Sequence, residues 1–220
     1  IVLIGRNKFK NNRDELIIKK LLLEFNDKDF TLTENECKEF FDECNAPISI
    51  TQNRRLYLKT EGWITAISMA MHSFVNDNDL SVPPTIFHLF ENSLYNHFDE
   101  DKIDFLLRVC IFDKFTKEQA RFVRRKDDPV ELLKSIVDAN EFVKFDEKYR
   151  NYRIQKFFAE YLQFRLSQKD IRYRKEVYRH AADWYYLNGR FFQATLCYYK
   201  SGNFEDMLKS FERDKGEGMS

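Results

Sequence analysis

Hydrophobic residues recur with a helical period along most of this 220-residue chain. The clearest set is Ile103, Leu106, Leu107, Cys110 and Ile111, whose spacing at i, i+3, i+4, i+7 and i+8 places them on one helical face. Capping signals predict the starts of further helices. These starts, with their inward residues, are Thr33-Glu36 with Cys37, Phe40, Phe41 and Cys44; Thr51 with Leu56; Thr116 with Ala120 and Val123; and Asp128-Pro129 with Leu132, Leu133, Ile136 and Val137.

One segment breaks this helical pattern. The stretches 141–145 and 149–154 are rich in aromatic and branched residues and flank the polar turn Asp146-Glu147-Lys148, which predicts a β-hairpin. A helix follows at once, with Phe157, Phe158, Tyr161 and Leu162 directed inward. Three helices followed by a hairpin is the order of a winged helix.

The two ends of the chain differ in character. Residues 1–4 predict a buried strand that ends at Gly5-Arg6, and a second short apolar run covers residues 21–25. A lone strand cannot bury its faces or pair its edges, so we expect the chain to be part of a longer protein. From Ile171 onward only helices are expected, interrupted at residues 188–189 and 202–203.

The C-terminal helices resemble a repeat. Trp184, Leu187, Gly189 and Ala194 follow the order of a tetratricopeptide unit. The last helix carries an apolar face that we expect to pack on the helix before it, and we expect part of the surface of that preceding helix to stay uncovered. The residues concerned are Phe204, Met207, Leu208 and Phe211 on the last helix; Phe192, Leu196 and Tyr199 opposite them; and Phe191, Leu196 and Tyr198 on the uncovered surface.

Composition and spacing set several kinds of chemistry aside. The 36 basic and 36 acidic residues balance, which gives no electrostatic case for nucleic acid or a membrane as main partner. The four cysteines have no Cys-x-x-Cys spacing and indicate reduced core thiols of a cytoplasmic protein. The four histidines are scattered and predict no metal site. The chain contains neither a nucleophile-elbow motif nor a phosphate-binding loop.

Two basic runs invite a nucleic-acid interpretation. Residues 121–126 are basic, but Asp127 and Asp128 follow directly, which favours a solvated helix end. The second run comprises Arg172, Tyr173, Arg174, Lys175 and Arg179, with a spacing that suits a repeat helix with one packed face.

Four segments, taken in order, resemble one family. IVLIGR resembles the arginine-ended strand of signal-transducing ATPases with numerous domains (STAND), and KTEGWITAISMA is similar to the Glu-Gly-Trp helix of MalT-like LuxR-family transcriptional regulators. EFVKFDEKYRNYRIQKFFAEYL resembles the family's wing and following helix, and HAADWYYLNGRFFQATLCYYKSGNFEDM resembles the first helices of its repeat sensor. The resemblance spans nearly the whole chain.

The resemblance assigns candidate nucleotide contacts. It implies that Gly62 lets the backbone approach an adenine ring, with Trp63 and Ile64 packed near the base; the alternative is that Gly62 begins a helix and Trp63 anchors the core. It implies that Arg6 senses the terminal phosphate, against the alternative of an exposed strand-end arginine. A guanidinium suits phosphate because it forms forked hydrogen bonds.

The sequence departs from the family at one further position. Where the family carries a phosphate-facing histidine, this chain has Gln155 followed by Lys156. Gln155 can still donate a hydrogen bond and Lys156 can supply charge, but neither titrates near neutral pH.

The resemblance therefore implies a mainly α fold with small β elements in four parts. Residues 1–30 are expected to be the remnant of an α/β nucleotide-binding core, 31–80 a helical lid, 81–167 a winged helix, and 168–220 the start of a TPR-like helical repeat. The lid and winged helix would close over ADP in the resting state, and inducer with ATP would release them for self-association.

In this interpretation the parent is a bacterial cytoplasmic regulator and a slow signalling NTPase that uses ATP or ADP with magnesium. The piece itself would be inactive and bind no nucleotide tightly. Its partners are the other domains of the parent, and DNA is contacted only through a helix-turn-helix beyond this chain. Two alternatives stay open: a protein-interaction scaffold of helical repeats, and a winged helix that itself binds DNA through residues 130–137, where Lys134 is the one basic residue.

Overall fold

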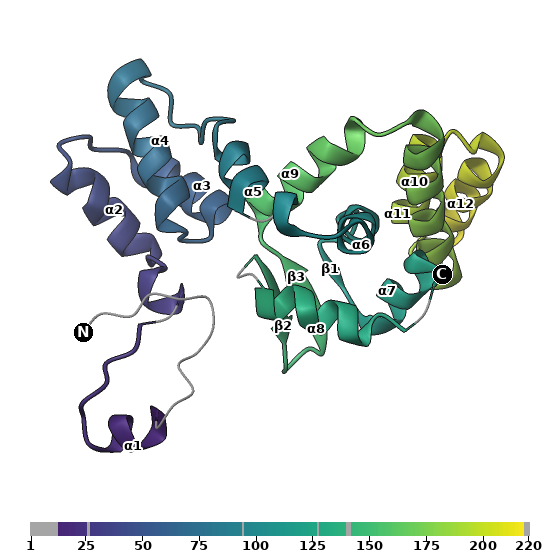
Figure 1. Cartoon of the computed structure of the whole chain (residues 1–220). Coiled ribbons are helices and arrows are strands. Elements are labelled where there is room, and N and C mark those ends of the chain that lie inside the picture. The colour runs from purple at the N-terminus through teal and green to yellow at the C-terminus, as the bar shows by residue number, and fades with distance from the viewer. Residues whose placement is uncertain (1–12, 26, 94, 127, 140–141, 218–220) are drawn as a thin grey trace. The chain divides into compact units, whose positions relative to one another are not determined.

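The fold is taken from a computed structural model that describes residues 13–25, 27–93, 95–126, 128–139 and 142–217 (Figure 1). In these ranges the chain is mainly helical with a small antiparallel sheet, which confirms the predicted fold class. Residues 1–12 lie outside the description, and with them the predicted strand and Arg6. No helix in the described part has the length and apolar character needed to cross a bilayer.

The described residues form two compact units. The first runs to Ser93 and also includes Asp138 and Ala139, and the second comprises the other residues that follow Ser93. The sequence-based boundaries at residues 30, 80 and 167 stay predictions.

The first unit consists of short helices. They are α1 (Arg13–Ile18), the 3-10 helix η1 (Asp27–Phe30), α2 (Glu34–Glu43), α3 (Ile50–Thr60), α4 (Ile64–Asp77) and α5 (Ile86–Ser93). Its core is built on the fully buried side chains of Phe41, Ile67 and Phe90. The apolar run at residues 21–25 has no regular structure, and Leu23 is 78 % exposed.

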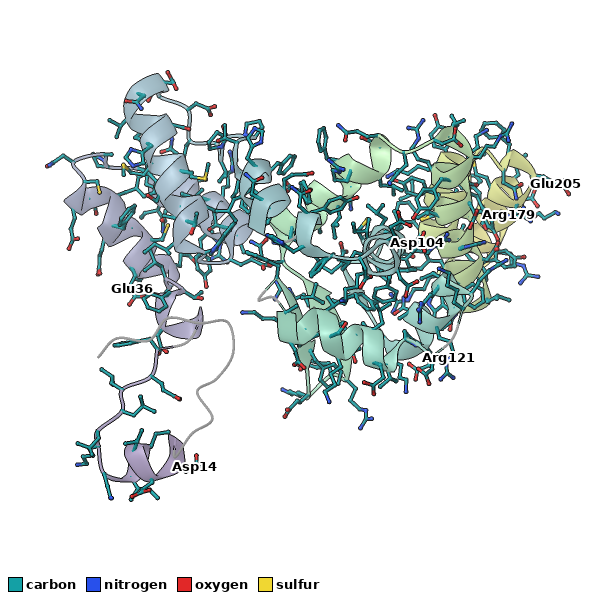
Figure 2. All side chains as sticks on the ribbon, in the orientation of Figure 1. Asp14, Glu36, Asp104, Arg121, Arg179 and Glu205 are labelled. Carbon is teal, nitrogen blue, oxygen red and sulfur yellow. The ribbon has the colours of Figure 1, made fainter. Side chains whose placement is uncertain are left out.

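Capping decides where these helices begin. Thr33 exchanges the two hydrogen bonds of a capping box with Glu36, which is labelled in Figure 2, and this confirms the predicted start of α2. The predicted cap of α3 at Thr51 is wrong, because Ser49 and Gln52 form a second capping box two residues earlier. Leu56 of α3 is buried as predicted.

The predicted apolar face of α2 is only partly buried. Cys37 and Phe41 are buried and Phe40 is half-buried, but Cys44 is exposed because α2 ends at Glu43 and Cys44 is its C-cap residue. The expectation that all four cysteines are core thiols is therefore wrong for Cys44.

The second unit begins with the elements of a winged helix. In chain order they are the 3-10 helix η2 (Tyr95–His97), α6 (Glu100–Val109), β1 (Lys114–Phe115), α7 (Lys117–Arg124), α8 (Val130–Ala139), β2 (Val143–Asp146), β3 (Asn151–Ile154) and α9 (Lys156–Ser167). The predicted starts of α7 at Thr116 and of α8 after Pro129 are confirmed. The four predicted inward residues of α9 are all buried.

The predicted hairpin is confirmed, and a third strand pairs with it to form a small sheet. Strands β2 and β3 pair from Val143↔Ile154 to Asp146↔Asn151, and the Asp146 carboxylate accepts two backbone N–H bonds that close the turn. The sequence did not predict β1, which pairs with β3 so that the sheet order is β1-β3-β2. Two residues are too few to show an alternating pattern.

Three helices complete the second unit. They are α10 (Ile171–Leu187), α11 (Phe191–Ser201) and α12 (Phe204–Glu217), and they pack as successive antiparallel neighbours in Figure 1, as predicted for a repeat.

The predicted packing face of the last two helices is confirmed at one contact, between Tyr199 and Phe204 with ring centroids 6.3 Å apart, but most of its residues are exposed. Phe192, Leu196, Phe204 and Leu208 are 49–59 % exposed, whereas Phe191 and Tyr198 are buried. The cause is the contact with α10. Tyr186 of α10 packs edge-on against Phe191, and the Tyr198 hydroxyl donates to Asp183 at 3.0 Å. These contacts turn a different face of α11 inward.

We expect this exposed apolar surface to cause weak self-association. Exposed apolar groups that gather on adjoining helices favour contact between molecules. Light scattering behind a sizing column should show a mass that rises with concentration, and Leu208→Glu should reduce the rise. Leu187→Glu, at a leucine of α10 that is even more exposed, should reduce it less. A chain that stays monomeric at high concentration contradicts the expectation.

Candidate functional site

The turn before α4 explains why glycine occupies position 62. Gly62 has φ +79°, in the left-handed region that favours glycine, and it follows Glu61, which is also left-handed. A Cβ at Gly62 would lie 2.1 Å from the carbonyl oxygen of Leu32, whose N–H donates to the Gly62 carbonyl at 2.9 Å. The close approach that requires a glycine is therefore made by the chain's own residues 31–32. An adenine contact at Gly62 stays a prediction.

Trp63 and Ile64 follow directly. Trp63 is the N-cap residue of α4, and its ring stacks on Phe90 with centroids 5.7 Å apart. This contact supports the anchoring alternative for Trp63 without excluding a ligand, because its side chain is only half-buried. Ile64, the first residue of α4, is 37 % exposed and is not part of the core.

Gln155 and Lys156 lie in the second unit, at the start of α9. The Gln155 N–H donates to the Phe142 carbonyl at 2.7 Å, and its side-chain Oε1 accepts from the N–H of Phe158 at 3.0 Å. Because a backbone N–H can only donate, this bond fixes which end of the amide faces the helix. The Nε2 group points the other way, buried and with no hydrogen-bond partner in the described residues. Lys156 is exposed.

A half-buried ionic cluster joins α6 to α10. Arg108 of α6 donates from Nε to Asp104 at 2.9 Å and from Nη1 to Glu176 of α10 at 3.0 Å. The Tyr173 hydroxyl donates to Asp104 at 2.7 Å, and Nη1 of Arg108 lies 3.3 Å from Nδ1 of His180. Figure 2 labels Asp104 among the side chains of this unit. Burial favours the neutral acid, but the hydrogen bonds from Arg108 and Tyr173 outweigh it and lower the pKa of Asp104.

This cluster is not predicted by the sequence. Its signals are two i, i+4 pairs, Asp104 with Arg108 and Glu176 with His180, but such pairs are common on exposed helices. Nothing in the spacing shows that the two pairs meet.

The described residues offer little for metal or nucleophilic chemistry. No three His, Cys, Asp or Glu side chains among them are grouped so as to hold a metal ion. Burial raises the pKa of Cys110 to about 12 and of Cys37 and Cys197 to about 11, so these thiols stay protonated near neutral pH.

The winged-helix region has a known relative. Residues 91–174 match the family model of the MalT winged helix domain, a range that includes α6 to α9, the sheet and the first residues of α10. Over these residues the chain is similar to the MalT winged helix domain. The resemblance to MalT-like regulators inferred from the sequence is confirmed by this match.

The chain as a whole is similar to a solved structure and matches no curated protein. The chain is similar to a Signal Transduction ATPase with Numerous Domains (STAND) protein with a tetratricopeptide repeat sensor from Pyrococcus horikoshii, with 20 % identity and a TM-score of 0.48. The similarity covers 83 % of this chain and 27 % of that protein, so the chain spans about a quarter of its length.

Proposed function

We propose that this chain is the switch region of a nucleotide-gated, signal-responsive transcriptional regulator of the MalT type, bacterial and cytoplasmic. In the resting parent protein the helical lid and the winged helix close over ADP, and inducer with ATP opens them for self-association. A differential affinity of a few kcal/mol between the two nucleotides is enough to move such a two-state equilibrium from mostly closed to mostly open.

The observation that carries the proposal is the side chain of Gln155. It occupies the position where the family has a phosphate-facing histidine, and its Nε2 group is a buried donor without a partner in the described residues. A buried donor that forms no hydrogen bond is costly, and a phosphate oxygen is a strong acceptor. Lys156, the next residue, adds a positive charge at the start of the same helix.

Gln155→Glu in the full-length parent should strongly reduce the amount of ADP that copurifies. The substituted side chain keeps the oxygen that caps α9 but replaces the donor with a negative charge that repels phosphate. Gln155→His, the family's residue, is the matched control and should retain ADP. Nucleotide is quantified by chromatography after denaturation, and melting curves check the fold. Equal ADP in all three proteins would exclude a phosphate contact for Gln155.

The 220-residue chain by itself should neither bind ATP tightly nor hydrolyse it, because the sequence contains no phosphate-binding loop. Isothermal titration should show no ATP affinity in the micromolar range, which corresponds to about 8 kcal/mol. A micromolar dissociation constant would contradict the proposal that tight nucleotide binding requires a phosphate-binding loop that this sequence does not contain.

A second candidate function, direct DNA binding by the winged helix, has one observation in its favour. Lys114, Arg153 and Lys144 lie side by side across the three strands, since Arg153 pairs with Lys114 on one side and Lys144 on the other, and all three are exposed. Against it, α8 offers only Lys134 as a basic residue. Salt-dependent binding to duplex DNA that Arg153→Gln weakens would favour this alternative. Unaltered binding, or none, would favour the switch.

A further inference from the structure

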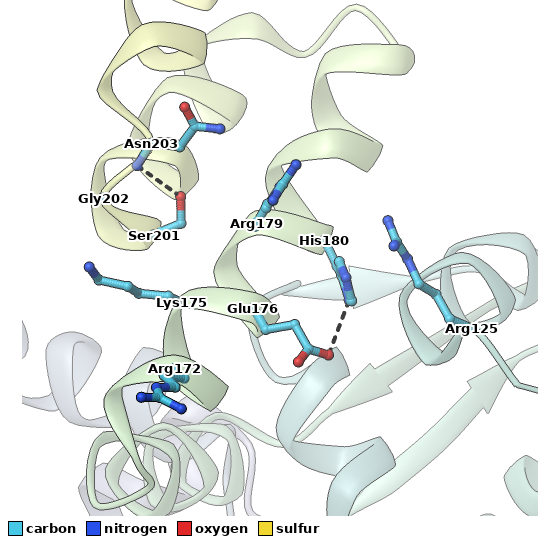
Figure 3. A pocket seen from close by; sticks show the side chains of 9 residues that line it. All are labelled: Arg125, Arg172, Lys175, Glu176, Arg179, His180, Ser201, Gly202 and Asn203. Atoms are coloured by element: carbon cyan, nitrogen blue, oxygen red, sulfur yellow. Dashed lines mark hydrogen bonds and ion pairs between the residues drawn. The ribbon is translucent and has the colours of Figure 1, made fainter.

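The described part of the second unit contains a pocket of about 610 Å³ beside α10 (Figure 3). One wall is a face of α10, a second is the turn between α11 and α12, and Arg125 at the end of α7 closes the third side. The lining residues are Arg125, Arg172, Lys175, Glu176, Arg179, His180, Ser201, Gly202 and Asn203.

The charge of this lining is unusual for a chain with 36 basic and 36 acidic residues in balance. Arg172, Lys175 and Arg179 are spaced at i, i+3 and i+7, so they share one face of α10. None of the three forms an ion pair with an acid in the described residues, although like charges at this spacing repel one another. A bound anion would offset that repulsion.

The only carboxylate in the lining does not cancel this charge. Glu176 accepts from Arg108 at 3.0 Å, and Arg108 comes from α6, outside the lining. Arg125 has a partner as well, Asp183, but at a looser 3.6 Å. The lining thus keeps a surplus of positive charge on α10.

Most of the neutral polar groups that line the pocket already form hydrogen bonds within the protein. The Ser201 hydroxyl donates to the Tyr198 carbonyl at 2.8 Å. Asn203 caps α12 by accepting from the N–H of Asp206 at Oδ1, and its Nδ2 donates to the Asp206 carboxylate at 2.6 Å. His180 is buried, and its Nδ1 faces the donor Nη1 of Arg108, which leaves the proton on Nε2. The cationic side chains of α10 are therefore the main groups through which the pocket could bind a ligand.

We propose that this pocket binds a small molecule that carries a phosphate or pyrophosphate group. Guanidinium and ammonium groups are the usual partners of phosphate oxygens, and Arg presents paired donors that match them. The volume falls within the range of small-molecule sites, roughly 300–1,000 Å³, and is large enough for a phosphate with an attached sugar. The pocket shares no residue with the nucleotide contacts predicted from the family resemblance.

The test is a titration of the whole 220-residue chain with inorganic pyrophosphate, glucose 6-phosphate and glucose, followed by NMR or calorimetry at low salt. We expect saturable binding of both phosphate-bearing probes with a Kd of about 0.1–1 mM and none of glucose. Lys175→Gln/Arg179→Gln should weaken this binding at least tenfold and leave the melting temperature unchanged or higher. Lys148→Gln, at an exposed lysine of the wing, is the control and should bind as the parent chain does.

Three outcomes would overturn the proposal. They are no saturable binding of either phosphate-bearing probe, equal binding by the double variant, and binding of an oligonucleotide that depends on Lys175 and Arg179 while pyrophosphate and glucose 6-phosphate do not bind. None of these outcomes bears on Gln155, so the switch and the pocket are tested separately.

Discussion

Arg108→Met is expected to lower the free energy of unfolding of the second unit by about 3 kcal/mol. Removing one partner of a buried ion pair costs roughly 3–5 kcal/mol, because the other charge is left without compensation. The Arg108 side chain is 12 % exposed and that of Asp104 is 24 % exposed, so some solvent reaches the orphaned carboxylate and the lower end of the range applies. Glu176 and His180 would lose the same partner.

Trp184 allows the second unit to be followed by itself. The chain has two tryptophans, Trp63 in the first unit and Trp184 in the second, so denaturation in a Trp63→Phe background reports on Trp184 alone. Arg121→Leu is the matched control. Arg121 pairs with Asp128, but both side chains are about half exposed, and such a surface pair contributes little to stability.

A double variant separates charge from packing. If the cost of Arg108→Met comes from the stranded Asp104 carboxylate, Arg108→Met/Asp104→Asn should lose less than the sum of the two single losses. A loss for Arg108→Met as small as that for Arg121→Leu would mean that the cluster does not connect α6 to α10 energetically.

The elements that sequence analysis predicted correctly are those fixed by neighbouring residues. The capping box of Thr33 and Glu36 and the Asp146 turn of the hairpin depend on residues within four positions of one another. The cap of α3 failed at the same scale, since Ser49-x-x-Gln52 is the fuller signal and Thr51 lacks a partner at that spacing. A capping signal thus predicts the correct helix start when both residues of the capping box are present at the right spacing.

The misplaced faces of α11 and α12 have a non-local cause. Both helices carry apolar residues on more than one side, so period alone cannot choose the inward face. The choice is made by Tyr186 and Asp183 of α10, which hold Phe191 and Tyr198. The pocket on α10 was missed for the same reason, because its cationic residues, interpreted from the sequence as part of a repeat helix with one packed face, are bordered by the distant turn at Gly202.

The candidate site was predicted by resemblance, and the structure adds local reasons for its residues. Gly62 has a role in its own turn, and Gln155 has both a capping role and an unpaired donor. Arg6 lies outside the described residues. A nucleotide contact could not be derived from the residue pattern, because the same pattern also suits a helix start.

Gly62→Ala is expected to destabilise the first unit by about 2–5 kcal/mol in the absence of nucleotide. A left-handed conformation costs a non-glycine residue roughly 1–2 kcal/mol, and forcing an extra carbon into a packed site adds roughly 1–3 kcal/mol. The clash is with the backbone oxygen of Leu32, which cannot swing aside as a flexible side chain would. Trp63 adjoins this turn, so its fluorescence in a Trp184→Phe background follows the loss.

Gly189→Ala is the matched control. Its unfolding is measured by the fluorescence of Trp184 in a Trp63→Phe background. Gly189 has φ +71°, close to that of Gly62, but an added Cβ would meet nothing within 4 Å. It should cost only the conformational part, roughly 1–2 kcal/mol. The difference between the two substitutions isolates the contact with Leu32. If they cost the same, the turn can relax around the added carbon, and the left-handed backbone alone accounts for the glycine at position 62.

The same comparison decides how the adenine contact can be tested in the parent protein. If Gly62→Ala disrupts the turn without nucleotide, loss of ADP from that variant says nothing about the base. Ile64→Ala is the informative change, because Ile64 is 37 % exposed and its truncation should cost the fold about 1–2 kcal/mol, without a backbone clash. Lower ADP retention in a variant whose melting curve shows that it is still fully folded would support contact with the base. Unchanged retention would leave Gly62 and Trp63 as structural residues of the turn.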